Sequence, residues 1–382
     1  MIIHGVETVI ENSRARVSAI VSLETPGLLF ESSGTCDLEL WIDWPADYFT
    51  PQTPDASAFI LICLPLAMSL GERIVTRDPI PEQLLLNILE AMAIYKSYFP
   101  KKCDEIELEV ATHRAAKNAD DRVGSFYSGG VDSLYNIAEL QRLARVFGVG
   151  VVTDLWLIQG MDIPLSDDVF WAEAKDTLMS PFASEDSIQC VDIRTNARAI
   201  HDRFVEWEAL GFSAILGGIA KCFSPIIGMA LIGSYGPYDD IIPHSSSPLV
   251  DPMWSCDRQL IRHFSCRVNR LEKLQTILNE TPDRLENLRV CYLNPDGAYN
   301  CGRCEKCLRT QLQLLICNSL DRCARFDERL SVQSLRHLKL PWRAKNQYAW
   351  DFWYDIRKAC REAGLVEYDR AIGRQFLRIG IW

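Results

Sequence analysis

The segment Phe126-Tyr127-Ser128-Gly129-Gly130-Val131-Asp132-Ser133 is the most informative stretch of this sequence. The apolar residues from Val123 predict a strand before it, and residues 131–147 predict a helix after it. Two adjacent glycines allow positive φ and a close backbone approach to an anion. The free N–H groups and the dipole at a helix N-terminus also favour negative charge. The stretch therefore predicts a strand–loop–helix unit that cradles phosphate, with a ligand-free glycine turn as the alternative.

The side chains of this loop indicate which phosphates it would hold. Ser128 and Ser133 add hydroxyl donors, and Asp132 only accepts, so we expect a metal ion beside the phosphate as its partner. The loop lacks the Lys-Ser/Thr ending of the Walker sequence, and the GxGxxG dinucleotide pattern is absent. These features favour binding of a pyrophosphate group.

The surrounding pattern predicts an α/β fold. Strands are expected at residues 123–127, 150–158 and 188–193, and helices at 131–147, 167–179 and 196–210; residues 214–218 are short and apolar. Such alternation predicts a mainly parallel sheet covered on both faces, with ligands at the carboxyl ends of the strands. Gln159 and Gly160 follow the second strand, so they are candidate nucleotide contacts, with a plain turn as the alternative.

The flanking regions suggest three domains. Residues 1–122 are expected to form a β-rich domain, with strands at 16–23, 36–41 and 106–111 and one long helix from Pro81. The linker is placed at 113–122, the nucleotide-binding domain at 123–326 and a helical extension at 327–382. Residues 58–70 are apolar but too short for a bilayer and contain Pro65, so we expect a core element there.

Composition narrows the function classes. The chain has 382 residues, 48% of them hydrophobic, and a formal net charge of -11. A surface this acidic excludes a broad electrostatic grip on nucleic acid. No export signal opens the chain, so we expect a cytoplasmic protein without a membrane segment, in which the 14 cysteines are reduced.

Four cysteines, Cys291, Cys301, Cys304 and Cys307, lie close together in the string CYLNPDGAYNCGRCEKC. Thiolates at this spacing suit a closed tetrahedral zinc site. An iron–sulfur centre is an alternative, although the next cysteine, Cys317, lies in the helical-looking run 308–320. Metal-free buried thiols are the third alternative. The other cysteines are expected to be buried, and Cys222, beside Lys221, is the candidate for a reactive thiol.

Further candidates rest on position alone. The long segment 234–252 mixes polar and aromatic residues, as functional loops often do, and Arg309 could reach a carboxylate or phosphate. The substrate candidates are therefore Tyr235, His244, Ser247, Asp251 and Arg309. None of the six histidines lies in a recognisable triad. The basic run Arg258, Arg262, His263, Arg267, Arg270 and Lys273 is interpreted as a solvated helix face, with an RNA or partner contact as the alternative.

Ser-Gly-Gly-Val-Asp-Ser at 128–133 resembles the signature of the PP-loop ATP pyrophosphatase superfamily. Together with the four cysteines, it makes residues 123 to about 315 resemble the 7-cyano-7-deazaguanine synthases. The resemblance implies a flavodoxin-like or Rossmann-like parallel sheet of the adenine nucleotide alpha hydrolase type. It implies ATP with Mg²⁺ at Tyr127, Ser128, Gly129, Gly130, Asp132, Ser133, Gln159 and Gly160, with Asp132 and Ser133 catalytic, and Zn²⁺ at Cys291, Cys301, Cys304 and Cys307.

The resemblance also implies the reaction. The expected activity is an ATP-dependent C–N ligase that adenylates a carboxylate, with a 7-deazaguanine carboxylate as one candidate. Ammonia or an amine would then give an amide or nitrile, AMP and pyrophosphate. A protein substrate or partner and a homodimer are further expectations. The alternatives are a PP-loop enzyme of tRNA sulfur transfer and a non-catalytic nucleotide-binding scaffold.

Overall fold

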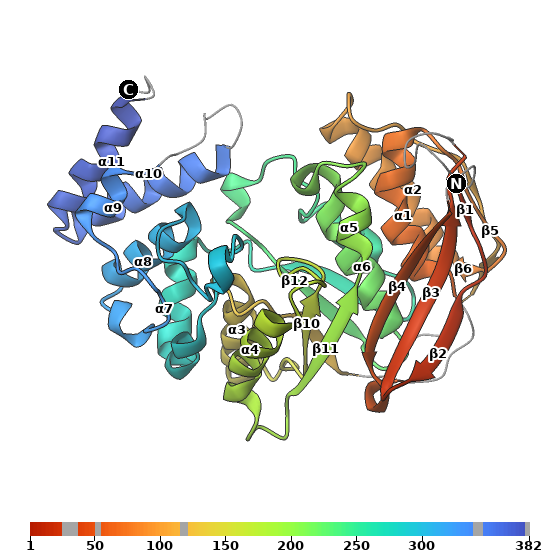
Figure 1. The fold of residues 1–382 in the computed structure, drawn as a ribbon, viewed down its shortest axis with the longest axis horizontal. Helices are drawn as coiled ribbons and strands as arrows, with labels where there is room; N and C mark the ends of the chain where they lie inside the picture. Colours follow the sequence, from red (N-terminus) through yellow and green to blue (C-terminus); the bar gives the residue numbers. More distant parts are fainter. Residues whose placement is uncertain (25–36, 50–54, 115–120, 339–346, 379–382) are drawn as a thin grey trace.

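The computed structural model describes residues 1–24, 37–49, 55–114, 121–338 and 347–378. Its centre is a mixed sheet of 11 strands among these residues, in the order β13-β12-β9-β10-β11-β4-β3-β1-β5-β7, with β2 paired to β3. Helices cover the sheet, so the chain has the mixed α/β architecture expected from the sequence (Figure 1).

One half of the sheet is parallel, and the 128–133 loop follows one of its strands. Its strands are β9 (Val123–Phe126), β10 (Asp154–Gln159), β11 (Gln189–Thr195), β12 (Met229–Gly233) and β13 (Leu260–Phe264). The chain order reverses between β9 and β12, because β10 lies on one side of β9 and β12 on the other. Ligands of open α/β sheets bind outside the carboxyl ends of the strands at such a reversal.

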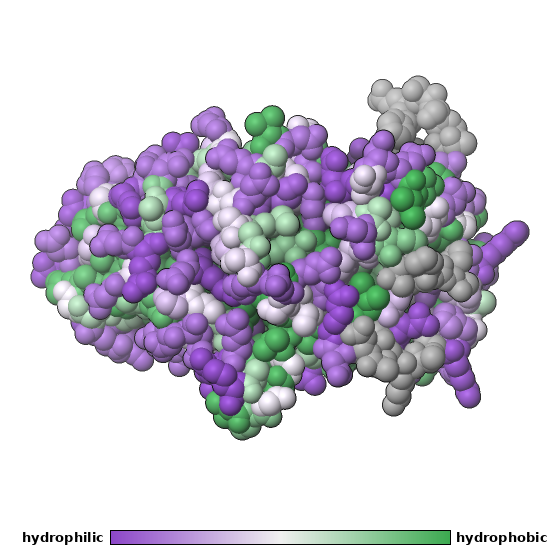
Figure 2. All heavy atoms as spheres, turned by 90° about the horizontal axis from the view of Figure 1, so that it is seen from below, coloured by the Kyte–Doolittle hydropathy of each residue, from purple (hydrophilic) through white to green (hydrophobic). Residues whose placement is uncertain are grey.

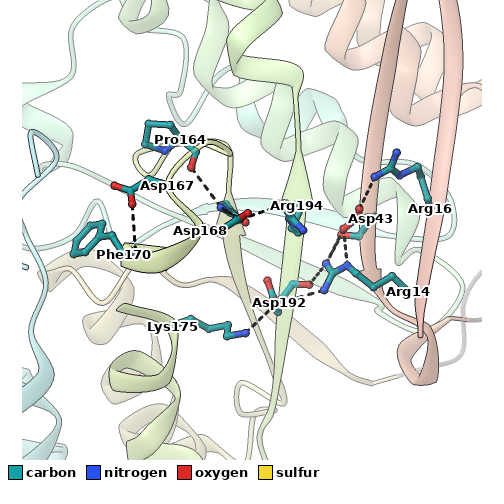
Figure 3. A network of polar contacts seen from close by, with 11 residues as sticks. Arg14, Arg16, Asp43, Pro164, Asp167, Asp168, Phe170, Lys175, Asp192 and Arg194 are labelled. Carbon is teal, nitrogen blue, oxygen red and sulfur yellow. Dashed lines mark hydrogen bonds and ion pairs between the residues drawn. The ribbon is translucent and has the colours of Figure 1, made fainter. Parts of the chain in front are cut away.

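The N-terminal strands continue the same sheet. They are β1 (Ile2–Ile3), β2 (Glu7–Glu11), β3 (Arg14–Ser22), β4 (Asp37–Pro45), β5 (Ile74–Thr76) and β7 (Leu108–Glu109), while β6 (Ile80–Pro81) and β8 (Thr112–His113) form a separate pair. β4 pairs antiparallel with β11. At this junction Arg14 donates to Asp43 Oδ1 at 2.8 Å and to the Asp192 carbonyl at 2.9 Å (Figure 3).

The helices lie on both faces of the sheet and at its ends. They are α1 (Ser57–Leu70), α2 (Glu82–Tyr98), α3 (Val131–Phe147), α4 (Asp168–Met179), α5 (Ala197–His201), α6 (Phe212–Cys222), α7 (Arg270–Glu280), α8 (Glu305–Ile316), α9 (Val332–Arg336), α10 (Gln347–Glu362) and α11 (Val366–Arg378). The C-terminal helices α9 to α11 and the N-terminal strands occupy opposite ends of the molecule (Figure 1).

The N-terminal region and one face of the parallel half of the sheet share a hydrophobic core. Side chains of β3, β4, α1, α2 and α6 belong to one hydrophobic core, which also contains Trp156 of β10. A second core on the other face contains residues of α3, α4 and α7. The domain boundary at residue 122 stays a prediction, and residues 115–120 of the expected linker lie outside the described residues. The described segments on either side of this linker belong to one sheet and share one hydrophobic core.

The sequence predictions of single elements differ in accuracy. The helix at 131–147 has the predicted bounds, and most of the described part of the C-terminal region is helical, in α9, α10 and α11. The predicted helix 196–210 is interrupted, because α5 ends at His201 and a π-helical turn follows at Trp207–Gly211. The apolar residues 214–218 lie inside the buried helix α6, and residues 58–70 lie inside α1. Short buried runs lack the periodicity that separates helix from strand.

The surface of the molecule is largely hydrophilic on the face drawn in Figure 2. The hydrophobic residues of this face form small separated patches. In the described part of the chain, no helix combines the length and apolar character needed to cross a membrane.

Candidate functional site at the carboxyl ends of β9, β12 and β13

The loop between β9 and α3 has the conformation that its glycines allow. Gly129 has φ +74, and a Cβ at this position would lie 2.1 Å from Leu178 Cδ2. The Gly129 carbonyl accepts from the Arg289 amide at 2.9 Å. Gly130 is the N-cap of α3, and Ser133 Oγ donates to its carbonyl at 3.0 Å. A bulkier residue at position 129 would disrupt this loop, since both the backbone angle and the space exclude a side chain.

Asp132 joins this loop to α7. Arg270 Nη1 donates to its Oδ2 at 2.6 Å, and Lys273 Nζ donates to its Oδ1 at 2.9 Å. Burial opposes the charge on Asp132, but the two cations outweigh it and hold its pKa well below the usual range. We expected a metal ion as the partner of this carboxylate; in the structure two cationic side chains take that place, because α7 brings them to the end of β9.

A basic pocket adjoins the loop. It is lined by Ser128, Gly130, Asp132, Asp162, Arg270, Arg289, Val290, Cys291 and Lys306. Arg270 and Arg289 are both buried, and within the described residues their Nε atoms have no hydrogen-bond partner. The guanidinium groups of these two arginines would attract an anion into the pocket. The pocket thus concentrates positive charge in an acidic protein.

Ser128 is exposed to this pocket, whereas Tyr127, Gln159 and Gly160 have structural contacts. The Tyr127 ring is buried against Phe182, with ring centroids 5.4 Å apart. Gln159 Nε2 donates to Asp168 Oδ1 at 2.9 Å, and Arg194 also reaches Asp168 (Figure 3). Gly160 has φ +95, and a Cβ there would lie 1.9 Å from the Thr195 carbonyl oxygen. The glycine is therefore required by the close approach of the last residue of β11.

The four clustered cysteines come together beside this pocket. Their sulfur atoms all lie within 4.8 Å of one another, and Cys301 Sγ is 3.9 Å from Cys307 Sγ. Tetrahedral zinc at Zn–S distances of about 2.3 Å requires sulfurs about 3.8 Å apart. Asn300 supports the site, because its Oδ1 accepts from the Val290 and Cys291 amides. The residues fit a closed metal site, and Cys291 belongs to both this site and the pocket wall.

The thiols of this cluster also show why a cation suits it. Hydrogen bonds from Cys304 and Cys307 hold the pKa of Cys291 far below its usual range. The bond to Cys291 raises the pKa of Cys304 to about 12 and that of Cys307 further. One thiolate therefore forms at the expense of its neighbours, whereas a divalent cation stabilises all four together.

Four of the five predicted substrate residues belong to a second cluster near β13. Asp251 Oδ2 accepts from His263 Nδ1 at 2.7 Å and from Ser246 Oγ at 2.8 Å, and Ser213 donates to its Oδ1. The Tyr235 ring contacts two imidazoles, with its centroid 5.5 Å from that of His244 and 6.5 Å from that of His263. Ser247 is fully buried, and its Oγ accepts from the Val250 amide at 3.2 Å. His263 was not recognised in the sequence as the partner of an acid, because it lies in β13, 12 positions after Asp251 in a short 3-10 turn.

The sequence analysis did not single out Cys266, a buried cysteine that follows β13. Burial raises its pKa, but hydrogen bonds with His263 and Ser234 outweigh burial and lower it. Burial of Cys222, by contrast, raises the pKa of that thiol to about 12, so it is not the reactive cysteine that we expected. Cys222 is the last residue of the buried helix α6, and the negative charge of Asp55 adds to the effect of burial on the pKa of its thiol.

Two other expectations about basic residues change. Arg270 and Lys273 are buried in the site, so the run 258–273 is not simply a solvated helix face; Arg262 and His263 belong to β13 instead. Arg309 lies in α8, where it pairs with Glu305 at 3.1 Å and lies 4.1 Å from the centroid of the Phe352 ring. It therefore stands apart from the other four substrate candidates.

Comparisons with protein-family models, with curated proteins and with solved structures found no match to this chain. The site is accordingly interpreted from its own residues.

Proposed function

We propose that this chain is an ATP-dependent C–N ligase of the PP-loop type. ATP with Mg²⁺ would occupy the basic pocket, and a small carboxylate would be adenylated and then joined to ammonia or an amine. The observation that carries the proposal is the set of three cationic side chains, Arg270, Arg289 and Lys306, that line the pocket beside the 128–133 loop.

Each part of the pocket suits a pyrophosphate leaving group. Gly129 and Gly130 leave the backbone open to oxygen atoms, and α3 begins at this point. Arg270, Arg289 and Lys306 supply positive charge that would stabilise the charge developing on pyrophosphate. Asp132 holds Arg270 and Lys273 in place, which is the role that its two ion pairs favour.

When bound, ATP would supply the adenylyl group that activates the carboxylate. Zinc would stabilise the structure and would take no part in the reaction. Cys291, Cys301, Cys304 and Cys307 would hold the zinc and thereby fix the wall of the pocket at Val290 and Cys291. The finer fold type, a PP-loop sheet of the Rossmann-like class, belongs to the same proposal. The order of β13, β12, β9, β10 and β11 supports it.

The binding step is tested by isothermal titration of the full chain with ATP and Mg²⁺. Arg289→Met is expected to weaken binding about tenfold or more, because a charge-assisted hydrogen bond contributes about 1.5–3 kcal/mol. Arg262→Met, at an exposed position on β13, is the matched control and should leave the affinity within about twofold. Equal affinities of the two variants would contradict the assignment of the pocket.

The chemical step is tested with α-labelled ATP, 7-carboxy-7-deazaguanine and an ammonium salt. The proposal requires AMP and pyrophosphate, whereas release of ADP would exclude it. Equal ATP binding by the wild type and Asp132→Ala, with no turnover in either, would favour the scaffold alternative.

One observation favours the sulfur-transfer alternative. That reaction needs a catalytic cysteine, and Cys266 has a lowered pKa outside the metal cluster. The formal net charge of the chain, -11, argues against RNA binding. A salt-dependent shift of tRNA in a native gel would support this second candidate.

A further inference from the structure

A second pocket lies at the opposite edge of the sheet from the 128–133 loop. Lys221, near the end of α6, precedes β12, and Cys256 precedes β13, so both residues lie toward the amino ends of these parallel strands. Both line the pocket, together with Ser57, the first residue of α1. Neither Lys221 nor Cys256 lines the proposed nucleotide pocket.

Lys221 and Cys256 are in direct contact. Lys221 Nζ lies 3.5 Å from Cys256 Sγ, although the two residues are 35 positions apart in the sequence. The lysine is 5% exposed and the cysteine 8% exposed. An amine and a thiol therefore face each other at a place that is largely shielded from water.

The surroundings hold this pair in position. Gln259 Oε1 accepts from Lys221 Nζ at 3.2 Å, and Gln259 Nε2 donates to the Ala220 carbonyl at 3.0 Å. The Cys256 and Gln259 backbones bond to each other in both directions, at 3.0 and 3.2 Å. The turn that carries the thiol is thus fastened to the end of the helix that carries the amine.

The amine has neutral or weakly acidic neighbours. Within the described residues its hydrogen-bond partners are the amide oxygen of Gln259 and the sulfur of Cys256. Burial lowers the pKa of Lys221, and the opposing effects of Cys256 and Asp55 do not overcome it. Because a buried ammonium without a carboxylate partner is costly, this environment favours the neutral amine, which is the nucleophilic form.

The pocket has space for a small oxidant beside the sulfur. It offers about 10 Å³ of room for the centres of water-sized molecules, which suits hydrogen peroxide. Ser57 Oγ lines this space, is buried, and has no hydrogen-bond partner among the described residues. A peroxide oxygen in the pocket would supply the missing partner.

We propose that Lys221 and Cys256 form a site of oxidative modification, at which a peroxide joins the two side chains through a sulfenamide S–N bond. The site lies apart from the proposed ligase site and does not depend on its activity.

The reaction balances with one molecule of peroxide. The Cys256 sulfur attacks a peroxide oxygen, the O–O bond breaks, and the departing hydroxide takes the thiol proton to form water. This step oxidises the sulfur by two electrons to a sulfenic acid and reduces the peroxide by the same number. The Lys221 amine then attacks the sulfur, an S–N bond forms, and the S–O bond breaks. The hydroxide that leaves takes a proton from the amine to form a second water.

The bond is tested by treating the intact full-length protein with hydrogen peroxide, blocking the remaining thiols and mapping the peptides by mass spectrometry. We expect a peptide pair joined at Lys221 and Cys256 that is lighter than its two parts by two hydrogen atoms. Excess dithiothreitol should separate the pair. An unmodified Cys256, or an oxidised Cys256 without a bond to Lys221, overturns the inference.

Cys103 provides an internal control in the same peptide map. It is also buried, and Lys96 Nζ lies 3.1 Å from its carbonyl oxygen, but that lysine forms an ion pair with Asp104. We therefore expect no S–N bond between Lys96 and Cys103. Peroxide treatment in urea should likewise give no bond between Lys221 and Cys256, because only the fold brings them together. Equal yields in the folded and unfolded protein would contradict the proposal.

Lys221→Met removes the amine while keeping a side chain of similar width. In this variant the Cys256 sulfenic acid should persist, and dimedone should trap it at least about ten times more than in the wild type. Equal trapping in the two proteins would overturn the inference. Circular dichroism shows whether the variant folds; where it does not, the peptide map of the wild type decides.

Discussion

Lys273 Nζ lies 2.9 Å from Asp132 Oδ1, although the two residues are 141 positions apart in the sequence. The lysine is fully buried and also donates to the Ser234 carbonyl, so it connects the end of β9 with the end of β12. This contact spans the place where the strand order reverses between β9 and β12, and it makes α7 part of the site.

The first prediction concerns this ion pair. Asp132→Asn should destabilise the protein by about 3 kcal/mol, because it leaves two buried cations without a counter-charge. Asp132→Asn combined with Lys273→Met should recover part of that loss. Urea unfolding monitored by circular dichroism measures both, and equal stability of the wild type and Asp132→Asn would refute the pairing.

The same carboxylate predicts a pH dependence. Its pKa is lowered from 3.8 in the folded state, so its contribution is present above pH 3.8 and disappears as the pH falls below that value. The difference in unfolding free energy between the wild type and Asp132→Asn should therefore shrink between pH 4 and more acidic conditions, in the range where the protein still folds. Unfolding curves at pH 7, 5, 4 and 3 test this sign, and a growing difference at low pH would contradict it.

The second prediction compares two glycines in order to distinguish the effect of a steric clash from the effect of backbone strain. Gly129 has φ +74 with Leu178 2.1 Å from a built Cβ, whereas Gly148 has φ +69 with nothing within 4 Å. Gly148→Ala should cost about 1 kcal/mol, and Gly129→Ala should cost more and abolish ATP binding. Thermal unfolding and ATP titration compare the variants; identical behaviour would mean that the 128–133 loop tolerates a side chain.

The third prediction concerns the metal site. Purified protein should contain about one zinc ion per chain, and Cys307→Ser should lose the metal and more than about 4 kcal/mol of stability. Cys317→Ser is the control, because Cys317 lies at the end of the same helix outside the cluster. Elemental analysis and thermal unfolding provide the measurement. Iron in place of zinc would select the iron–sulfur alternative.

The fourth prediction concerns His201, which is fully buried and hydrogen-bonded to the Ile62 carbonyl of α1 at 2.7 Å. Burial lowers its pKa from 6.5 to about 4, so between these values the unfolded chain binds a proton that the folded chain does not. Stability should fall as the pH decreases from 6.5 to 4, by about 3 kcal/mol at about 1.4 kcal/mol per pKa unit. His201→Gln should show a shallower decline over this range, and parallel curves would show that His201 does not titrate there.

The local features of the site could be predicted from the sequence. Gly129 and Gly130 between an apolar strand and a helix leave few conformations, so the loop and α3 follow from neighbouring residues alone. The spacing of Cys301, Cys304 and Cys307 likewise predicts a shared centre, because a short chain brings these sulfurs together.

The contacts between distant segments could not be predicted in this way. Nothing near Asp132 in the sequence indicates Lys273, and nothing near Cys266 indicates that Asp251 would orient His263. The order of β12, β9 and β10 in the sheet determines which strand ends meet, and hydrophobic patterns do not encode that order. The sequence alone thus determined the conformation of the 128–133 loop and the cysteine cluster, whereas only the tertiary structure decided the partners of Asp132 and Cys266, since long-range packing selects them.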